Sequence, residues 1–262
     1  MRLAPAVVAV LCLALGGTPA DAVTESPTGP VARPASNAGT FIVQALPGPS
    51  VSLSIDGALE SRAVSSGDIL GPLRLSPGKH TVTVAGRNPE WTMDATVRTT
   101  ERGSIDVVLH RPASVKGRPT VTVYRNQVGA VAREKGRVMV AHTATVPPAD
   151  ITVDGRVVFA NIANGEFATA EVPSGPHEVS IVPTGRTKPV LLGPLTLKAE
   201  PRTLTQVFAV GQPSNGSMDV VVHRLPLETR GSAAPERVET GSAGLVSGLP
   251  GVFWPGRSML TW

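Results

Sequence analysis

The chain has 262 residues, of which 41% are hydrophobic, 17% charged and only 3% aromatic, and its formal net charge is +4. The small charge excess and the scarcity of rings that stack on bases exclude a typical nucleic-acid-binding protein. The single cysteine, Cys12, excludes a disulfide framework and a cysteine-based zinc site. Burial and hydrogen bonds must therefore stabilise the folded part.

Residues 1–22 have the pattern of a secretory signal peptide. Arg2 gives a short basic start, residues 3–17 form a mainly apolar run, and Ala20 and Ala22 supply the small side chains of a cleavage site. The apolar run is too short for a good membrane span. We therefore expect cleavage after Ala22 and a protein that is secreted, extracellular or attached to the cell envelope.

Two segments have the composition of disordered chain. Residues 23–39 and 227–262 are rich in Pro, Ser, Thr, Ala and Gly, which bury too little apolar surface to offset the entropy of ordering. We predict a flexible spacer at 23–39 and a low-complexity tail at 227–262. Because Pro250 and Pro255 interrupt the apolar end of the tail, we expect no stable transmembrane anchor.

Between these segments, runs of alternating apolar and polar residues recur about every eight to twelve positions. Examples are VSLSIDG, KHTVTVAG, SIDVVLH, DITVDG and HEVSIVP. A period of two in Val-, Ile- and Thr-rich runs indicates strands with one buried face. No stretch keeps a helical spacing over three turns. The pattern predicts an all-β protein built from immunoglobulin-like β-sandwiches.

The strand patterns occur twice, at a nearly constant offset. The Asp-Gly pairs end at Gly57 and Gly155, which are 98 residues apart, and His80 and His177 are 97 residues apart. A constant offset in the same order indicates a tandem duplication. The predicted boundaries are 40–126 for the first β-sandwich domain, 127–135 for the linker and 136–226 for the second β-sandwich domain.

The most similar phrases in the two copies are turn signals. In SPGKHTVTV and PSGPHEVSI a proline and a glycine precede a new strand, and we expect Gly78 and Gly175 to adopt positive φ. Asp56 and Asp154 each precede a glycine, which is a strong signal for a two-residue hairpin turn. Folding therefore explains the repetition without a shared ligand.

The densest basic cluster is REKGR, from Arg133 to Arg137, and it contains Glu134. We interpret it as a solvated turn between the two domains. A weak attraction to anionic envelope polymers is the alternative.

The second copy resembles a known family. The shared motifs are V-x-V-x-H from Val138, then D-I-x-V-D-G, P-x-G-x-H and V-x-A-V-G. This pattern is similar to a family of secreted bacterial proteins known as domain of unknown function 4397, and the resemblance is strongest over residues 138–211. It implies tandem immunoglobulin-like repeats outside the cytoplasm. The family has no established activity, so the resemblance implies no catalytic residue.

The residues that most invite a catalytic interpretation do not have the required spacing. Asp150 and Asp154 lie on one face of a predicted strand, but about 13 Å separates their Cα atoms. The carboxyl groups of glycosidases lie roughly 5 to 9.5 Å apart. The chain also lacks a G-x-S-x-G elbow and a glycine-rich phosphate loop. We therefore expect no enzymatic activity and no cofactor.

The histidines do not have the spacing of metal ligands on one element. The five are His80, His110, His142, His177 and His223. We expect polar roles at strand ends and no metal site. His142 lies in an apolar strand, where a buried imidazole is expected to hold a loop by hydrogen bonding.

Trp91, in the predicted loop GRNPEWTMD, is the one candidate ligand-binding residue. Its ring is suited to stacking on a sugar, and the competing interpretation is that it caps one open end of the first sandwich. We expect a non-enzymatic structural or adhesive module whose partner is a cell-wall polymer or an envelope protein, with no nucleic-acid partner. The alternative is an extracellular carbohydrate-binding or enzyme accessory module that uses Trp91.

Overall fold

A computed structural model of the chain describes residues 38–87, 90–228 and 240–241. The predicted signal peptide at 1–22, nearly all of the predicted spacer and most of the predicted tail lie outside the described residues. Within the described ranges the regular elements are strands and one short 3-10 turn at Pro213–Asn215. None of the described segments is a helix with the length and apolar character needed to cross a membrane.

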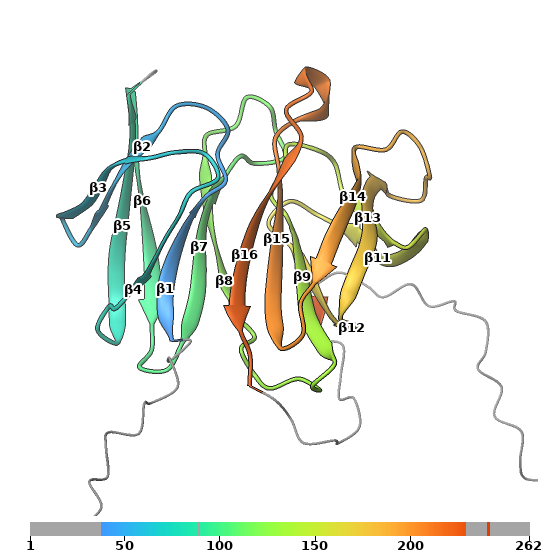
Figure 1. The fold of residues 1–262 in the computed structure, drawn as a ribbon. Helices are drawn as coiled ribbons and strands as arrows, with labels where there is room; N and C mark the ends of the chain where they lie inside the picture. Colours follow the sequence, from blue (N-terminus) through green and yellow to red (C-terminus); the bar gives the residue numbers. More distant parts are fainter. Residues whose placement is uncertain (1–37, 88–89, 229–239, 242–262) are drawn as a thin grey trace, which may run out of the picture. The chain divides into compact units, whose positions relative to one another are not determined.

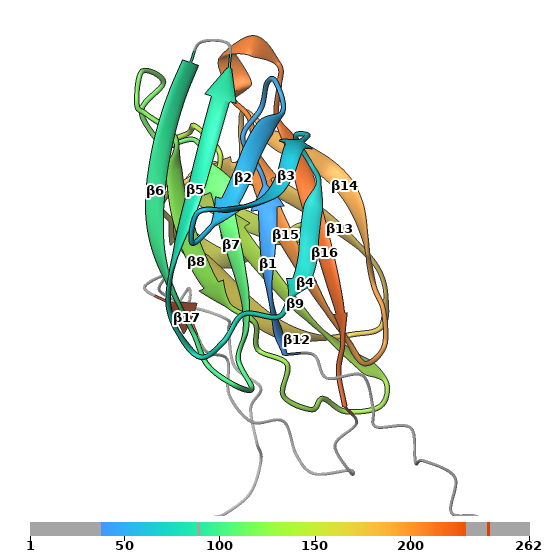
Figure 2. The same cartoon turned by 90° about the vertical axis from the view of Figure 1, so that its left-hand side faces the viewer.

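The first repeat forms two four-stranded sheets, ordered β4-β1-β7-β8 and β3-β2-β5-β6 (Figures 1 and 2). Its strands are β1 (Gly39–Gln44), β2 (Val51–Ile55), β3 (Ala58–Val64), β4 (Ile69–Leu73), β5 (Gly78–Arg87), β6 (Glu90–Thr99), β7 (Ser104–His110) and β8 (Thr120–Arg125). We call this unit the first sandwich. Strand β1 runs parallel to β7, and the other neighbouring strands are antiparallel.

The second repeat has the same arrangement, with sheets ordered β16-β15-β9-β12-β17 and β11-β10-β13-β14. Its strands are β9 (Lys135–His142), β10 (Ala149–Val153), β11 (Arg156–Ile162), β12 (Phe167–Pro173), β13 (Gly175–Pro183), β14 (Leu192–Ala199), β15 (Thr203–Val210) and β16 (Asp219–Pro226). Each of the eight strands has a counterpart in the first sandwich, and β9 runs parallel to β15 as β1 does to β7. The predicted all-β fold with two β-sandwiches is confirmed.

Part of the predicted C-terminal tail is joined to the second sandwich. Leu227 is buried, and its N–H donates to the carbonyl of Arg202 at 2.7 Å. A short strand, β17 (Thr240–Gly241), extends the sheet by pairing with β12 at Ala168.

The predicted turns have the expected backbone geometry. Asp56 and Asp154 have φ values of 49° and 50°, and the glycine after each also has a positive φ. This geometry is that of a two-residue turn that joins twisted antiparallel strands, and Asp tolerates it better than most residues. Gly78 and Gly175 have φ values of 148° and 144° at the starts of β5 and β13.

Each sandwich has its own apolar core between its two sheets. In the first sandwich this core contains Leu53, Val82 and Val107, together with buried apolar residues of the neighbouring strands. In the second sandwich it contains Ile151 and Phe159. The alternating pattern of the sequence accounts for both cores, because every second side chain of a strand points to the same face.

A third apolar cluster, which we call the shared core, joins the two sandwiches. It combines side chains of the first sandwich with side chains of the second and with Val131 between them. The members are Phe41, Val43, Ala45, Val108, Tyr124, Val131, Met139, Ala141, Leu204, Phe208, Val210, Val221, Leu225 and Leu227. Strands β1, β7, β9 and β15 are therefore buried on both faces.

A buried polar group lies beside the shared core. Asp106 of β7 is fully buried, and one of its carboxylate oxygens lies 2.8 Å from Nδ1 of His223 and accepts a bond of 2.8 Å from Gln206. Its other oxygen accepts a bond from the Asn126 amide at 2.7 Å. A buried carboxylate without partners is strongly unfavourable, so these bonds make the two sandwiches depend on each other.

The segment between the sandwiches is held by Arg137, the last residue of the REKGR cluster. Its guanidinium is buried and donates to the carbonyls of Gln127 and Gly129 and, at 2.6 Å, to the carboxylate of Glu171. Arg133 and its neighbour Glu134 are exposed, as the solvated turn requires. Arg137 differs because it satisfies carbonyl groups that a bent linker leaves without strand partners.

We expect Phe208→Ala to lower the free energy of unfolding by about 3 to 5 kcal/mol, because it empties a fully buried site in a shared apolar core. The Phe208 ring lies 5.6 Å from that of Tyr124 in the other sandwich. Both sandwiches should therefore still unfold in one transition, measured by denaturant titration. Two separated transitions, with only one shifted, would contradict the mutual dependence.

Candidate functional site

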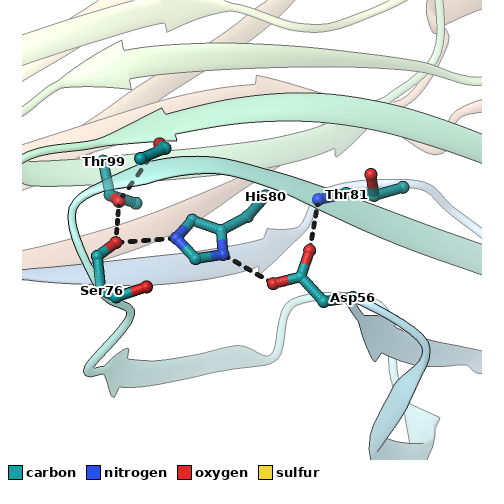
Figure 3. Close-up of polar contacts among 6 residues, drawn as sticks. Asp56, Ser76, His80, Thr81 and Thr99 are labelled. Carbon is teal, nitrogen blue, oxygen red and sulfur yellow. Dashed lines mark hydrogen bonds and ion pairs between the residues drawn. The ribbon is translucent and has the colours of Figure 1, made fainter.

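The first of the two repeated phrases forms a histidine clamp (Figure 3). His80 Nδ1 lies 2.7 Å from Oδ2 of Asp56, in the β2–β3 turn, and its Nε2 lies 2.7 Å from the carbonyl of Ser76. The second carboxylate oxygen of Asp56 accepts a bond from the N–H of Thr81 at 2.8 Å. The clamp therefore ties the β2–β3 hairpin to the start of β5. The Ser76 carbonyl also accepts a bond from the hydroxyl of Thr99.

The second phrase forms the same clamp. His177 Nδ1 lies 2.9 Å from Oδ2 of Asp154, its Nε2 lies 3.0 Å from the carbonyl of Pro173, and the N–H of Glu178 donates to Oδ1 of Asp154. Ala199 pairs with Gly175 as Thr99 pairs with Gly78 in the first clamp. Because alanine has no hydroxyl, the second clamp lacks the bond that Thr99 donates in the first. The repeated Asp-Gly and Pro-Gly-x-His signals thus belong to one structural unit.

Both clamps favour a charged imidazole. In each, the two ring nitrogens face oxygen acceptors, so both bonds form only when both nitrogens carry a proton. The bond to Asp56, followed by the bond to the Ser76 carbonyl, raises the pKa of His80, and the same pairing lowers the pKa of Asp56. The equivalent bonds raise the pKa of His177 and lower that of Asp154.

A histidine and an aspartate in contact are two parts of a nucleophilic triad, but these clamps lack the third part. The nitrogen that would activate a hydroxyl instead faces a main-chain carbonyl, even in the clamp that contains Ser76. A carbonyl oxygen has no proton to give up, so the imidazole is not placed to act as a general base there. The clamps therefore join strands.

Two other histidines lie where the sandwiches meet. His110 Nδ1 lies 2.8 Å from the carbonyl of Arg111, and its Nε2 lies 2.8 Å from the Thr122 hydroxyl. His142 Nε2 lies 3.2 Å from the carbonyl of Pro147, so it holds the following loop as the sequence predicts. Burial lowers the pKa of both imidazoles.

The two aspartates considered as a catalytic pair have separate partners. Asp150 is buried, and its two carboxylate oxygens accept bonds from the N–H groups of Asn161 and Gly185. Asp154 belongs to the second clamp. Among the described residues, no three His, Asp or Glu side chains form a group suited to a metal ion.

Trp91 lies in strand β6 and not in a loop. It is partly buried and packs against the core of the first sandwich. It pairs with Gly86 across the strands, and a Cβ at Gly86 would lie 2.3 Å from the indole nitrogen. The ring therefore lies over the backbone of Gly86, and a side chain at position 86 would force the ring to shift.

A groove with a volume of about 760 Å³ lies at one end of the first sandwich. Its walls come from the start of β1, the segment after β4, the end of β6 with the turn that follows it, and the end of β8. Trp91 is not one of its lining residues. Sequence reasoning missed this site, because its residues come from four separate segments and carry no local motif.

Comparison with protein families matches part of the chain. Residues 41–149 match the family model described as a domain of unknown function, DUF4397. This match supports, over those residues, the family resemblance found in the sequence. The matched segment covers the first repeat and the start of the second, whereas the resemblance in the sequence is strongest over residues 138–211. Among curated proteins, none matches the chain.

The clamps predict a stability that depends on pH. Because folding raises the pKa of His80 above its ordinary 6.5, its ion pair stabilises the fold below that pH and is lost as the pH rises through the folded-state pKa. Because folding lowers the pKa of Asp56 below 3.8, this partner's contribution is lost only as the pH falls through its own folded-state pKa. The clamp therefore stabilises most between these ordinary values.

We expect His80→Gln to lower the thermal midpoint by more at about pH 5 than at about pH 8. Circular dichroism of the two proteins at both pH values gives the comparison. His110 and His142, whose lowered pKa values give the opposite dependence, are present in both proteins and cancel. His177→Gln is the matched variant and should behave with the same sign. An equal loss at both pH values would contradict the charged clamp.

Proposed function

We propose that this chain is a non-enzymatic structural or adhesive module. Its residues 41–149 match a family without an assigned activity. In this proposal it is secreted or attached to the cell envelope, and its partner is a cell-wall polymer or an envelope protein. The chain presents the end of a β-sandwich to that partner.

The groove at the end of the first sandwich carries the proposal. Its volume of about 760 Å³ lies within the roughly 300 to 1,000 Å³ of sites that bind organic ligands. It is built from turns and strand ends, which tolerate changes of sequence while the sheets behind them hold their positions. This arrangement suits recognition at the end of a sandwich.

The junction between the sandwiches supports a structural role. Apolar packing, the Asp106–His223 contact and a bond from the Asn164 amide to the carbonyl of Arg111 at 3.1 Å all cross it. A pair of sandwiches joined in this way resists relative motion better than two domains on a flexible linker. Such a unit is suited to holding a binding surface at a fixed distance from an attachment point.

The alternative, a carbohydrate-binding or accessory module that uses Trp91, has less support. A sugar-stacking ring must present an open face, and the ring of Trp91 is partly buried over Gly86. The alternative remains the second candidate because part of the ring is accessible.

We expect the purified chain to sediment with isolated bacterial cell envelopes in a saturable manner. Removing the wall polymers from the envelopes should abolish sedimentation if the partner is a polymer, and protease treatment should abolish it if the partner is a protein. Protein that stays in the supernatant with untreated envelopes would contradict the binding role. Turnover in a broad screen of esters and glycosides would contradict the non-enzymatic one.

We expect Trp91→Ala to leave envelope binding within about twofold of the unchanged chain, because the residue packs against the core of the first sandwich and lies outside the groove. Met93→Ala is the matched control, since Met93 is also partly buried against the same core from the same strand. A loss of about tenfold or more for Trp91→Ala alone, with both variants folded, would favour the carbohydrate-binding alternative.

A further inference from the structure

The groove of the first sandwich is lined by four arginines. Arg74 follows β4, Arg98 lies in β6, Arg102 lies in the turn between β6 and β7, and Arg125 ends β8. The strand registers place these positions at one end of the sandwich, because Thr40 pairs with Leu73, Gly78 with Thr99, and Ile105 with Arg125. The fold thus gathers residues from across more than fifty positions of sequence.

The lining is strongly basic. Glu101 is its one acidic residue, so four arginines less one glutamate give a charge of +3 around the groove, against +4 for the whole chain. All four arginines are exposed. Within the described ranges, none of the four side chains forms an ion pair with an acidic residue. Their guanidinium groups are therefore available to a ligand.

One pair of like charges on the sheet beside the groove destabilises the fold when no ligand is bound. Lys79 of β5 lies directly opposite Arg98 of β6, and both are exposed. Like charges at directly opposed positions of antiparallel strands destabilise the pair. A bound anion would relieve this repulsion, so the arrangement favours a negatively charged ligand.

The size and chemistry of the groove narrow the ligand class. A volume of about 760 Å³ equals that of roughly 25 water molecules, at about 30 Å³ each, so a single inorganic ion would fill only a small part of it. No aromatic residue is among its lining residues, so stacking on sugar rings or bases is not how it would recognise a ligand. Guanidinium groups match phosphate and carboxylate oxygens in pairs.

We propose that the groove binds a segment of an acidic polymer whose repeating anionic groups are phosphates or carboxylates, held by Arg74, Arg98, Arg102 and Arg125. This inference rests on the proposed binding role and names its ligand class. The several guanidinium groups engage successive anionic groups along the polymer, so recognition depends on charge spacing more than on the neutral part of each unit.

The test uses two soluble probes, inorganic polyphosphate for the phosphate chemistry and polygalacturonate for the carboxylate chemistry. The groove variant replaces all four arginines, as Arg74→Gln, Arg98→Gln, Arg102→Gln and Arg125→Gln. The control variant makes the same change of net charge at exposed positions away from the groove, as Arg87→Gln, Arg156→Gln, Arg186→Gln and Lys188→Gln. Thermal unfolding shows whether both variants keep the fold.

We expect at least one probe to bind the unchanged chain, and the groove variant to bind it about tenfold more weakly or worse at about 150 mM salt. The control variant should stay within about twofold of the unchanged chain. The binding constant of the groove variant should also depend less on salt. In a plot of the logarithm of the binding constant against the logarithm of salt concentration, the slope should fall by on the order of 0.7 for each lost contact, the value for single-stranded nucleic acids. The probe that binds more tightly identifies the anionic group.

Equal weakening of both variants would overturn the proposal, because general charge attraction would then explain the binding. Binding of neither probe would overturn it as well, and so would tighter binding to single-stranded DNA of equal length or binding only to anionic lipid vesicles. The envelope experiment distinguishes a failure of the arginine site from a failure of the proposed binding role. A groove variant that still sediments with envelopes would disprove the arginine site and leave the binding role, whereas an unchanged chain that binds polyphosphate but no envelope would disprove the binding role.

Discussion

Burial of two sheets on both faces is the constraint on which the rest of the structure depends. Strands β1 and β7 of the first sandwich face their own core on one side and the shared core on the other, and β9 and β15 do the same in the second. An exposed sheet surface of that size would be a large apolar patch, which soluble monomers rarely keep. Neither sandwich is therefore complete without the other.

The sequence predicts well those features that depend on neighbouring residues. The period-two runs identify most strands, and the Asp-Gly pairs at Asp56 and Asp154 identify the hairpins, because both signals express local backbone preferences. The second buried face was not predictable in this way. In SIDVVLH, Asp106 and His110 have the period of a solvent-facing side of the strand, yet they lie against the second sandwich. Tertiary contact decides which polar face meets water.

The candidate sites also differ in whether neighbouring residues or tertiary contacts determine them. The repeated histidine phrases predict turns, and the structure adds the ion pairs that make each turn a clamp between strands. The segment GRNPEWTMD predicts a loop at Trp91, whereas the structure places Trp91 in β6, one residue after the start of that strand. The four arginines of the groove share no local pattern. The pairing of β1 with β4, of β5 with β6 and of β7 with β8 brings them together.

The Asp106–Gln206 contact shows that the two copies are no longer interchangeable. Gln206 of β15 is the counterpart of Asp106 in β7. The two positions are 100 residues apart in the sequence. Two identical first repeats packed in this manner would bring a buried carboxylate against a second one, which is strongly repulsive in a medium of low polarity. The amide at position 206 removes that conflict by supplying a donor. Duplication followed by this single change of side-chain chemistry would favour the unlike pair within one chain over association between like halves of separate chains.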